Sequence, residues 1–460
     1  MYKSILFVYM GTWPRRLASL ACVACLPAAA GASTAAPAAV AGAPLLSKSV
    51  AWDELKKNGL RWQQTLTLRP EAEAKRVEAE SALSLKVGFV AQQFGMHTNP
   101  NEYGIPDHIQ GINWIFFGST GIELEATLLD LVERTKIAIA RTGVKIADGQ
   151  SREFQTDLTA LMLLQFLETQ RLKRELMVID SNLERDRVIL KLAKSKIAAG
   201  AGIPLDVAKA KSLTGADTLK RASTYTKFIK TRQGLALLIG REKPEWDVEA
   251  LRFEPVSETL FDHALENSLR DRADLRVASL NAQSAAYGRD EAKRRIWPKV
   301  TLLGSTGIAS IDPFGMGNHS AFNGFAGIKF MIPLWSGGLM DAERQKAEAI
   351  SARAELQLKQ THLMLLSEVK AAFGSLLNAR QAIVASEDYV TTAQDESRIA
   401  EQRYYSGASN LLELASAHAN LIGANDSNTE AIYSYEKAKI GCFHSMGNFD
   451  PYFTETQVSP

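Results

Sequence analysis

The sequence repeats a turn motif at a fixed spacing. Gly407 stands 207 residues after Gly200, and each glycine is followed six positions later by an acid, Asp206 or Glu413. The same offset relates two further pairs of glycines, Gly234 to Gly441 and Gly240 to Gly447. A repeat of about half the chain predicts two similar units packed together. Each copy predicts a helix, a tight turn and a second helix, and two such turns at one height suggest a ring around a passage.

Long stretches without proline predict helices well beyond the usual length in a globular protein. Between Asp341 and Tyr405 there is no proline and one glycine, Gly374. Those ~65 residues would reach ~95 Å as one helix. Apolar residues recur there every three or four positions, which predicts an amphipathic helix. Further helices are expected over residues 52–82, 152–198, 204–239, 257–296 and 410–446.

Short segments of alternating polarity interrupt the helices, two in each half. Strands are expected at about 85–94, 114–127, 300–309 and 325–334. Because side chains alternate between the faces of a strand, Glu123, Glu125 and Lys329 should lie opposite their apolar neighbours. Trp297 and Trp335 flank the second pair of strands at its helical ends.

Two interpretations of these strands stay open. They are hairpins of a soluble domain, or transmembrane strands with apolar groups outside and Glu123, Glu125 and Lys329 inside. In the second case Trp297 and Trp335 would lie in the aromatic belt at the membrane interface. Four strands cannot close a wide barrel, and open edges in lipid leave backbone groups unpaired. Membrane-spanning strands would therefore have to be pooled from several chains.

The N-terminus predicts an export signal over residues 1–32. Basic residues precede an apolar run that ends in small residues suited to cleavage, and residues 33–50 are expected to be a flexible lead-in. Lipidation at Cys22 or Cys25 is an alternative. Cys442 is then the single cysteine of the mature chain, so no intramolecular disulfide is expected. Without Lys3, Arg15 and Arg16 the chain has 50 basic and 51 acidic residues, and no nucleic-acid partner is expected.

Three segments in this order resemble the TolC-like outer membrane efflux proteins, and the resemblance covers nearly the whole chain after the leader. They are Arg272 to Arg276 on the helix that leads to Trp297-Pro298, Pro333-Leu334-Trp335-Ser336-Gly337-Gly338, and Arg403 through Leu414. The first half lacks the Pro-Leu-x-x-Gly-Gly junction and has Thr127-Leu128-Leu129-Asp130 in its place.

The resemblance implies a mainly α-helical homotrimer with an internal two-fold repeat. Each chain would give four strands to a shared β-barrel in outer membrane lipid and its helices to a periplasmic α-barrel. The repeats would span residues 51–240 and 257–447, with an equatorial linker at 241–256 and a tail at 448–460. Most of each chain would lie in the periplasm of a Gram-negative bacterium.

The resemblance also implies where the two turns act. They would form the periplasmic tip and meet a periplasmic adaptor protein through Gly200, Gly202, Gly407 and Ser409. The adaptor would connect the duct to an inner membrane transporter. The family often places acids six and nine positions after the second tip glycine; here these positions hold Glu413 and Ser416, and the first copy has Asp206 and Lys209.

Asp206, Lys209, Glu413 and Ser416 are therefore expected at a pore constriction that is only partly acidic. The simpler interpretation is that Asp206 and Glu413 are ordinary partners of a helix dipole or surface charges. Their recurrence in both copies favours the pore-facing ring. Carboxylates crowded around a narrow passage would raise one another's pKa and act on charged solutes.

No catalytic, cofactor or metal site is expected. The mature chain has no phosphate-binding loop, HExxH or CxxC motif. His97, His108 and His319 fall in expected outer loops and read as solvated surface, while His362, His418 and His444 stand singly on helices. Ser119 and Ser305 read as small strand residues and not as nucleophiles. The sequence thus predicts a passive outer membrane exit duct of an efflux or type I secretion system. The rival is a periplasmic coiled-helix structural or adaptor protein without a pore, and an enzyme comes third.

Overall fold

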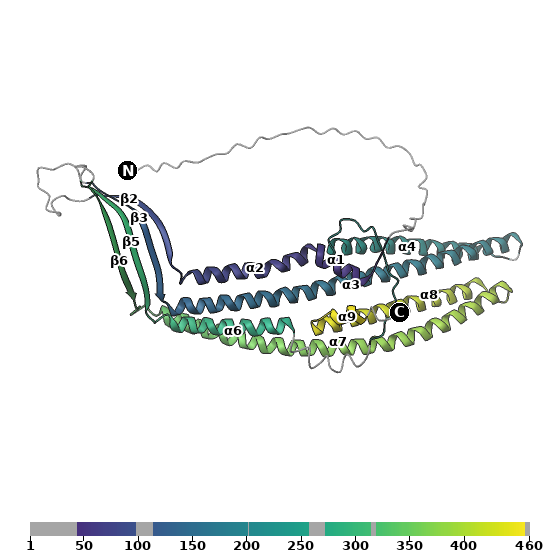
Figure 1. Ribbon diagram of the computed structural model, residues 1–460. Coiled ribbons are helices and arrows are strands. Elements are labelled where there is room, and N and C mark those ends of the chain that lie inside the picture. Colours follow the sequence, from purple (N-terminus) through teal and green to yellow (C-terminus); the bar gives the residue numbers. More distant parts are fainter. Residues whose placement is uncertain (1–43, 98–113, 201, 257–271, 314–318, 456–460) are drawn as a thin grey trace, which may run out of the picture. The chain divides into compact units, whose positions relative to one another are not determined.

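The computed structural model of the chain describes residues 44–97, 114–200, 202–256, 272–313 and 319–455. The expected export signal, Cys22, Cys25 and His108 lie outside these ranges. Helices and strands from residue 44 onward appear in Figure 1. Within this part the element order of one half is repeated in the other.

Each half consists of a medium-length helix, two strands, a very long helix and a returning helix. The first half contains α2 (Leu60–Ser81), β2 (Lys86–His97), β3 (Trp114–Leu129), α3 (Leu131–Ala198) and α4 (Pro204–Leu238). The second contains α6 (Ala273–Arg294), β5 (Lys299–Pro313), β6 (His319–Met331), α7 (Leu339–Tyr405) and α8 (Leu411–Met446). The helices α3 and α4 pack along each other, as do α7 and α8 (Figure 1). The predictions of a mainly helical chain, two strands in each half and an internal repeat are confirmed.

Two helix predictions were wrong at their N-terminal ends. The helix expected to begin at residue 152 begins at Leu131 and runs for 68 residues. Asp130 is its N-cap: the Oδ1 atom accepts hydrogen bonds from the amides of Val132 and Glu133 at 2.9 and 3.0 Å. The helix expected over 52–82 is divided at Gly59 into α1 (Lys48–Asn58) and α2. A Cβ atom on Gly59 would lie 2.4 Å from the carbonyl oxygen of Leu55, so only glycine fits this close approach.

The four long strands form one antiparallel sheet in the order β2-β3-β5-β6. The pair in the middle, β3 and β5, joins the two halves through a ladder from Ile115 and Pro313 to Leu129 and Val300. The strands are longer than predicted. The loop expected over residues 312–324 is mostly strand, because β5 continues to Pro313 and β6 already begins at His319. His97 and His319 are therefore strand ends, and Trp335 lies beyond the end of β6.

The largest apolar core lies where both ends of the described chain meet the segment between the halves. There β1 (Leu45–Leu46) pairs in parallel with β4 (Asp247–Val248). The short C-terminal helix α9 (Asp450–Glu455) packs beside α1, and the rings of Trp52 and Phe453 stack at 4.2 Å. Large fully buried side chains of this core come from α1, α3, α8, α9 and the linker, among them Leu55, Met162, Phe166, Trp246, Phe443 and Tyr452. We call this region the belt.

Candidate functional site

Both repeated turns have the same backbone geometry. Gly200 and Gly407 adopt positive φ values of 73° and 80°, a conformation that L-residues with a Cβ atom avoid. At the second turn the amide of Gly407 bonds to the carbonyl of Tyr404 and the amide of Ala408 to that of Arg403. This pair of backbone hydrogen bonds is the pattern that ends a helix sharply at a glycine. Gly202 is needed for a different reason, because a Cβ atom there would lie 2.7 Å from the backbone nitrogen of Ile197.

The two turns pack against each other. The Lys196 ammonium, from the first turn, donates to the carbonyl of Tyr404 at 2.9 Å and lies 3.7 Å from the centre of its ring. Buried apolar residues of all four helices fill the space between the hairpins: Ile189, Ala210, Ala400, Tyr404, Leu411, Leu414 and Ala417. The sequence repeat therefore places its two copies side by side at the end of the helices away from the sheet.

The acids of the two turns differ in their partners. Glu413 pairs with Arg403 at 3.0 Å, accepts from the Ser409 hydroxyl at 2.8 Å and has its own amide capped by Asn410 at 3.0 Å. Asp206 makes no ion pair with any described residue. The pKa of Tyr404 is raised, mainly by burial and secondly by the charge of Asp206. The negative charge of the second turn is thus partly neutralised inside the chain, and that of the first turn is not.

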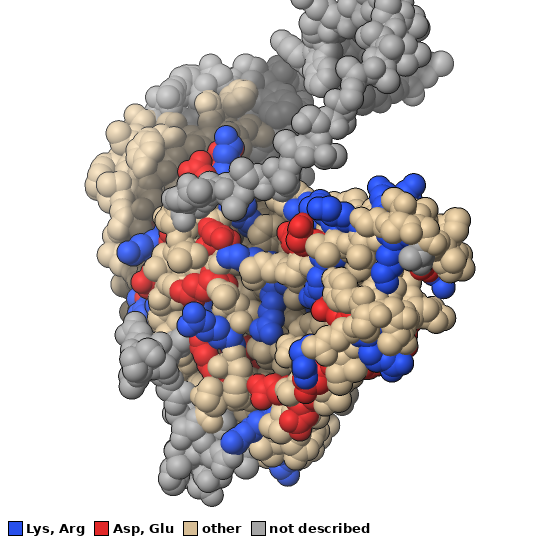
Figure 2. Space-filling model, turned by 90° about the vertical axis from the view of Figure 1, so that its right-hand side faces the viewer, with Lys and Arg blue, Asp and Glu red and all other residues tan. Residues whose placement is uncertain are grey.

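Lys209 lies half-buried one turn along α4 from Asp206, and Ser416 is exposed one turn along α8 from Glu413. Ser409 is half-buried beside Glu413. Figure 2 looks onto the end of the molecule that carries the turns, where acidic and basic side chains are interspersed. The expectation that these residues line a constriction, and that the turns meet an adaptor, stays a prediction.

The sheet has two chemically different faces, which follow from its pairing register. Val87 stands opposite Leu124, which stands opposite Gly304, and Ile308 stands opposite Phe322. Residues of this face are apolar and mostly exposed: Val87, Phe89, Ile122, Leu124, Leu302, Ile308, Phe322, Ile328 and Phe330. A contiguous exposed apolar surface of this kind marks contact with a membrane or another protein.

The opposite face carries the charges that the alternation predicted. Glu125 faces Lys86 across the β2–β3 ladder, Glu123 faces Ser305, and Lys329 faces Thr301. All three predicted charges are exposed on this face near the helices, whereas Phe94 and Phe117 stack at 5.3 Å farther along the strands. Trp297 and Trp335, just outside the strands, are 56% and 88% exposed. The lumen and interface roles of these residues stay predictions.

The belt contains a buried charge network that the sequence pattern does not predict. Lys48 contacts Glu254 at 3.1 Å and Glu436 at 3.8 Å, and Lys439 lies 3.6 and 3.8 Å from the same carboxylates. The residues belong to α1, the linker and α8, far apart in the sequence, so no local pattern could show it. The Asp130 cap did leave a signal, because Asp130 and Glu133 precede an apolar run with the spacing of a capping box.

The single histidines on helices have carboxylate neighbours. His418 is buried with its Nε2 atom 2.9 Å from Glu401, and burial lowers its pKa although Glu401 opposes this. His444 lies 2.8 Å from Asp157. Among the described residues no group of three histidine, cysteine or acidic side chains is placed to hold a metal ion.

No helix in the described ranges combines the length and the apolar composition needed to cross a membrane.

The comparisons with known proteins agree on one class. The family model described as "Outer membrane efflux protein" matches residues 264–448. Nodulation protein T of Rhizobium leguminosarum bv. trifolii is 25% identical over 280 residues, 59% of each chain. The pyoverdine export outer membrane protein OpmQ of Pseudomonas putida is 22% identical over 290 residues, 61% of this chain and 60% of its own. The alignments thus span about three-fifths of these relatives' length.

The fold matches solved outer membrane channels. The outer membrane protein VceC of Vibrio cholerae superposes with a TM-score of 0.74 at 19% identity, over 87% of this chain and 96% of its own. The paired helical hairpins joined to one antiparallel sheet are thus a fold that this chain shares with solved outer membrane proteins. The chain is thus similar to outer membrane efflux proteins in sequence, over residues 264–448 for the family model, and to outer membrane channels in fold. This similarity places the chain in the outer membrane of a Gram-negative bacterium.

Proposed function

We propose that the chain forms a passive exit duct through the outer membrane as a homotrimer. The observation that carries the proposal is the two-faced sheet with open edges. The sheet has four strands, and β2 and β6 each have one neighbour. Backbone groups at such edges need partners inside a bilayer, and β6 of one copy and β2 of the next would supply them. Three copies would close the sheet with the apolar face toward lipid.

The polar face would then line the lumen. Glu123, Glu125 and Lys329 all lie on it, on two strands of the same sheet. Trp297 and Trp335 would lie at the periplasmic interface of the bilayer, where amphipathic rings are favoured. No catalytic step belongs to this function, because the duct only lets solutes pass.

The paired turns would form the narrow end of the duct. Asp206, Lys209, Glu413 and Ser416 would surround the constriction, each present three times in the trimer. Because Arg403 neutralises Glu413, the constriction would be less cation-selective than a ring of free acids. Opening would have to part the contacts between the hairpins, among them the bond from Lys196 to Tyr404.

The partners would be a periplasmic adaptor at the turns and, through it, an inner membrane transporter. The exposed turn residues Gly200 and Gly407 have open space around them, which suits close backbone contact with another protein. Ser409 and Gly202 would border the same contact.

Single-channel recording in planar bilayers tests the duct. Purified protein should give discrete conductance steps, and the absence of any conductance would count against a pore. Two variants of one ion pair test the constriction with opposite signs. Arg403→Gln frees the Glu413 carboxylates and should raise the preference for cations, whereas Glu413→Gln should lower it. If both variants and the natural chain gave equal reversal potentials, the placement of Glu413 at the constriction would be contradicted.

A further inference from the structure

The two helical hairpins leave an outer helix on each side of the chain. The helix α3 packs along α4 and along α8, and α8 packs along α7, so that α4 and α7 are the outer helices of the row (Figure 1). The α4 helix belongs to the first half of the repeat and α7 to the second. Each of these two helices keeps an exposed side along most of its length near the turns.

The exposed side of α4 carries an uncharged stripe with the spacing of a coiled coil. Positions 205, 208, 212, 215, 219, 222, 226 and 229 follow one another at intervals of three or four residues, and all are exposed. Leu205, Leu219 and Ile229 in this stripe are 57%, 74% and 42% exposed. Every charged residue of α4 lies off the stripe. A stripe of apolar and small residues with this spacing is the surface through which one helix packs against another.

The positions beside the α4 stripe are basic. Lys209, Lys211 and Lys230 stand next to it, where charged side chains form ion pairs between the helices of a coiled coil. No acid of α4 occupies such a position. Lys211 and Lys230 are exposed and make no ion pair with any described residue. This side of the chain therefore carries positive charge that the chain itself does not neutralise.

The corresponding side of α7 carries unpaired acids. Positions 377, 381, 384, 388, 391, 395, 398 and 402 have the same spacing and are all exposed, and Val384 among them is 60% exposed. The stripe includes Asp388, Asp395 and one base, Arg398, which lies 3.2 Å from Asp395 in an exposed and therefore weak pair. Asp388 and the adjacent Glu387 make no ion pair with any described residue. The α7 side is thus the more acidic of the two.

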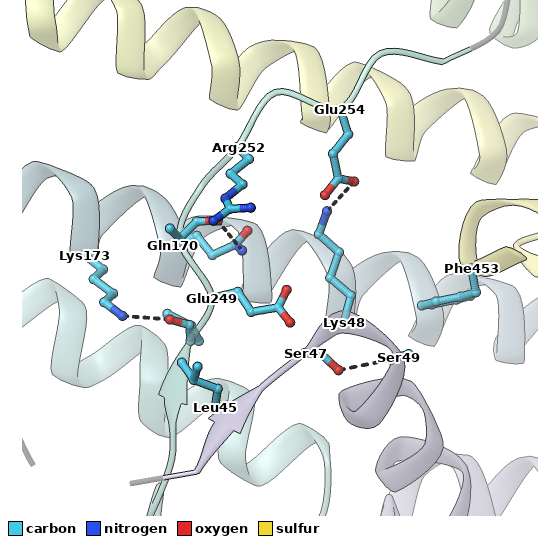
Figure 3. Close-up of a pocket in the computed structure, with 12 residues that line it drawn as sticks. Leu45, Ser47, Lys48, Ser49, Gln170, Lys173, Glu249, Arg252, Glu254 and Phe453 are labelled. Carbon is cyan, nitrogen blue, oxygen red and sulfur yellow. Dashed lines mark hydrogen bonds and ion pairs between the residues drawn. The ribbon is translucent and has the colours of Figure 1, made fainter. Parts of the chain in front are cut away.

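Charges elsewhere in the chain have partners within it. On α2, which packs along α3 near the sheet, Lys75 pairs with Glu71 at 2.6 Å. In the belt, Lys48 pairs with Glu254 at 3.1 Å (Figure 3). The unpaired charges on α4 and α7 are of opposite sign, and both lie near the turns. This arrangement suits two surfaces that meet in an assembly.

Lys211 and Asp395 stand at the same height. Lys211 comes 11 residues after Gly200, and Asp395 comes 12 residues before Gly407. At the rise of an α-helix both lie roughly 17 Å from their turns. A rotation axis along the helices preserves this height in every copy of a closed ring. The lysine of one copy and the acid of the next can therefore face each other.

We propose that the α4 stripe of one copy packs against the α7 stripe of a second copy, with Lys211 of the one paired to Asp395 of the other. The inference rests on the proposed homotrimer. Joining β6 of one copy to β2 of the next brings a second half beside a first half, and hence α7 beside α4. The joint near the turns is held partly by charge and weakens with salt, whereas the backbone pairing of the strands does not depend on charge.

Disulfide trapping in the full-length protein in detergent tests the joint. Ala222→Cys on α4 and Val384→Cys on α7 stand 22 and 23 residues from their turn glycines. The two helices lie on opposite sides of one chain, so a disulfide between these cysteines joins two copies. Mild oxidation should give covalent trimers in non-reducing gels, and either cysteine variant alone should not. Raising NaCl from about 0.05 M to about 0.5 M should slow the linkage about threefold or more.

A charge exchange tests the ion pair in the same cysteine background. Lys211→Glu places like charges opposite each other and should slow the linkage about fivefold, and adding Asp395→Lys should restore most of the rate. The matched control is Lys191→Glu on α3, an exposed lysine of the same hairpin without an ion pair to any described residue, and it should leave the rate unchanged. Thermal unfolding checks that all variants are folded.

Light scattering separates the two possible failures. A trimer that forms no disulfide between α4 and α7 would overturn the docking of these helices and leave the homotrimer standing. A protein that is monomeric throughout would overturn the homotrimer itself. Linkage that ignores both salt and Lys211→Glu would overturn the charged joint, and so would equal slowing by Lys211→Glu and Lys191→Glu.

Discussion

Replacing Lys48 should increase local opening of the belt far more than replacing a lysine of an exposed ion pair increases opening there, even though the exposed pair is shorter. The Lys48 side chain is 10% exposed and that of Glu436 is 1% exposed. Burial raises the pKa of Glu436, whereas Lys439 and Lys48 oppose this shift. Lys48→Met would leave Glu436 with Lys439 as its one remaining cation, at 3.8 Å.

The magnitude follows from burial. Breaking a buried pair by deleting one partner costs about 3–5 kcal/mol, because the other charge stays buried. The lower end applies here, since Lys439 remains. A loss of about 3 kcal/mol corresponds to roughly a hundredfold change in a local opening equilibrium.

Hydrogen exchange reads this opening at defined amides. The amide of Glu254 donates to the Glu436 carboxylate at 3.2 Å, and that of Val256 to the Tyr435 hydroxyl at 3.1 Å. In Lys48→Met both should exchange roughly a hundredfold faster. In the double variant Lys48→Met/Glu436→Gln, which buries no unpaired carboxylate there, most of the protection should return.

The control is Lys75→Met on α2. Lys75 lies only 2.6 Å from Glu71, but the two side chains are 68% and 62% exposed, so exchange in the belt and in α2 should change less than twofold. Lowering the pH should narrow the difference in belt amide exchange between Lys48→Met and the natural chain. The pKa of Glu436 is raised in the fold, so the ionised carboxylate destabilises the fold above that pKa. Protonation of Glu436 at lower pH removes this destabilisation. Equal exchange in Lys48→Met and Lys75→Met would refute the reasoning.

Three further predictions concern single side chains. Gly407→Ala should destabilise the second turn by about 1–2 kcal/mol, because φ is 80° there while the space is open; Gly374→Ala inside α7 should instead stabilise by about 0.5–1 kcal/mol, and chemical denaturation compares them. Asp130→Ala should cost about 1 kcal/mol through the lost cap, while Asp130→Asn should keep most of it; equal exchange of the Val132 amide in both would contradict the cap. Burial first and Asp217 second raise the pKa of Asp186 to about 6. Ionisation of Asp186 therefore lowers the free energy of unfolding as the pH rises from about 4 through 6. Asp186→Asn should stabilise by on the order of 1 kcal/mol at pH 7 and not at pH 4, as melting temperatures would show.

The sequence predicted what is local and periodic. Proline-free amphipathic runs predicted α7 almost to its ends, and the repeated glycines predicted both turns, because a positive φ restricts the residue type. Alternation predicted that Glu123, Glu125 and Lys329 would share one face, because every strand side chain alternates.

The sequence could not predict what depends on long-range approach. The partner of Glu413 was missed although Arg403 is near in sequence, because the turn that brings them together had to be known first. The belt network joins Lys48 to Glu254 and Glu436 across most of the chain. The early start of β6 was missed because His319 to Asn323 carry no alternating pattern strong enough to outweigh their loop-like composition.

The belt also determines the order in which the molecule can be completed. A chain delivered from its N-terminus presents Lys48 and Trp52 long before Glu436 and Phe453 arrive. Closing so long a loop is entropically unfavourable until those late residues supply their contacts. The apolar side of α1 can therefore be covered only when the C-terminal residues, which come last along the chain, are present. A chain truncated before α9 lacks the Phe453 ring that stacks on Trp52, so its belt core stays incomplete.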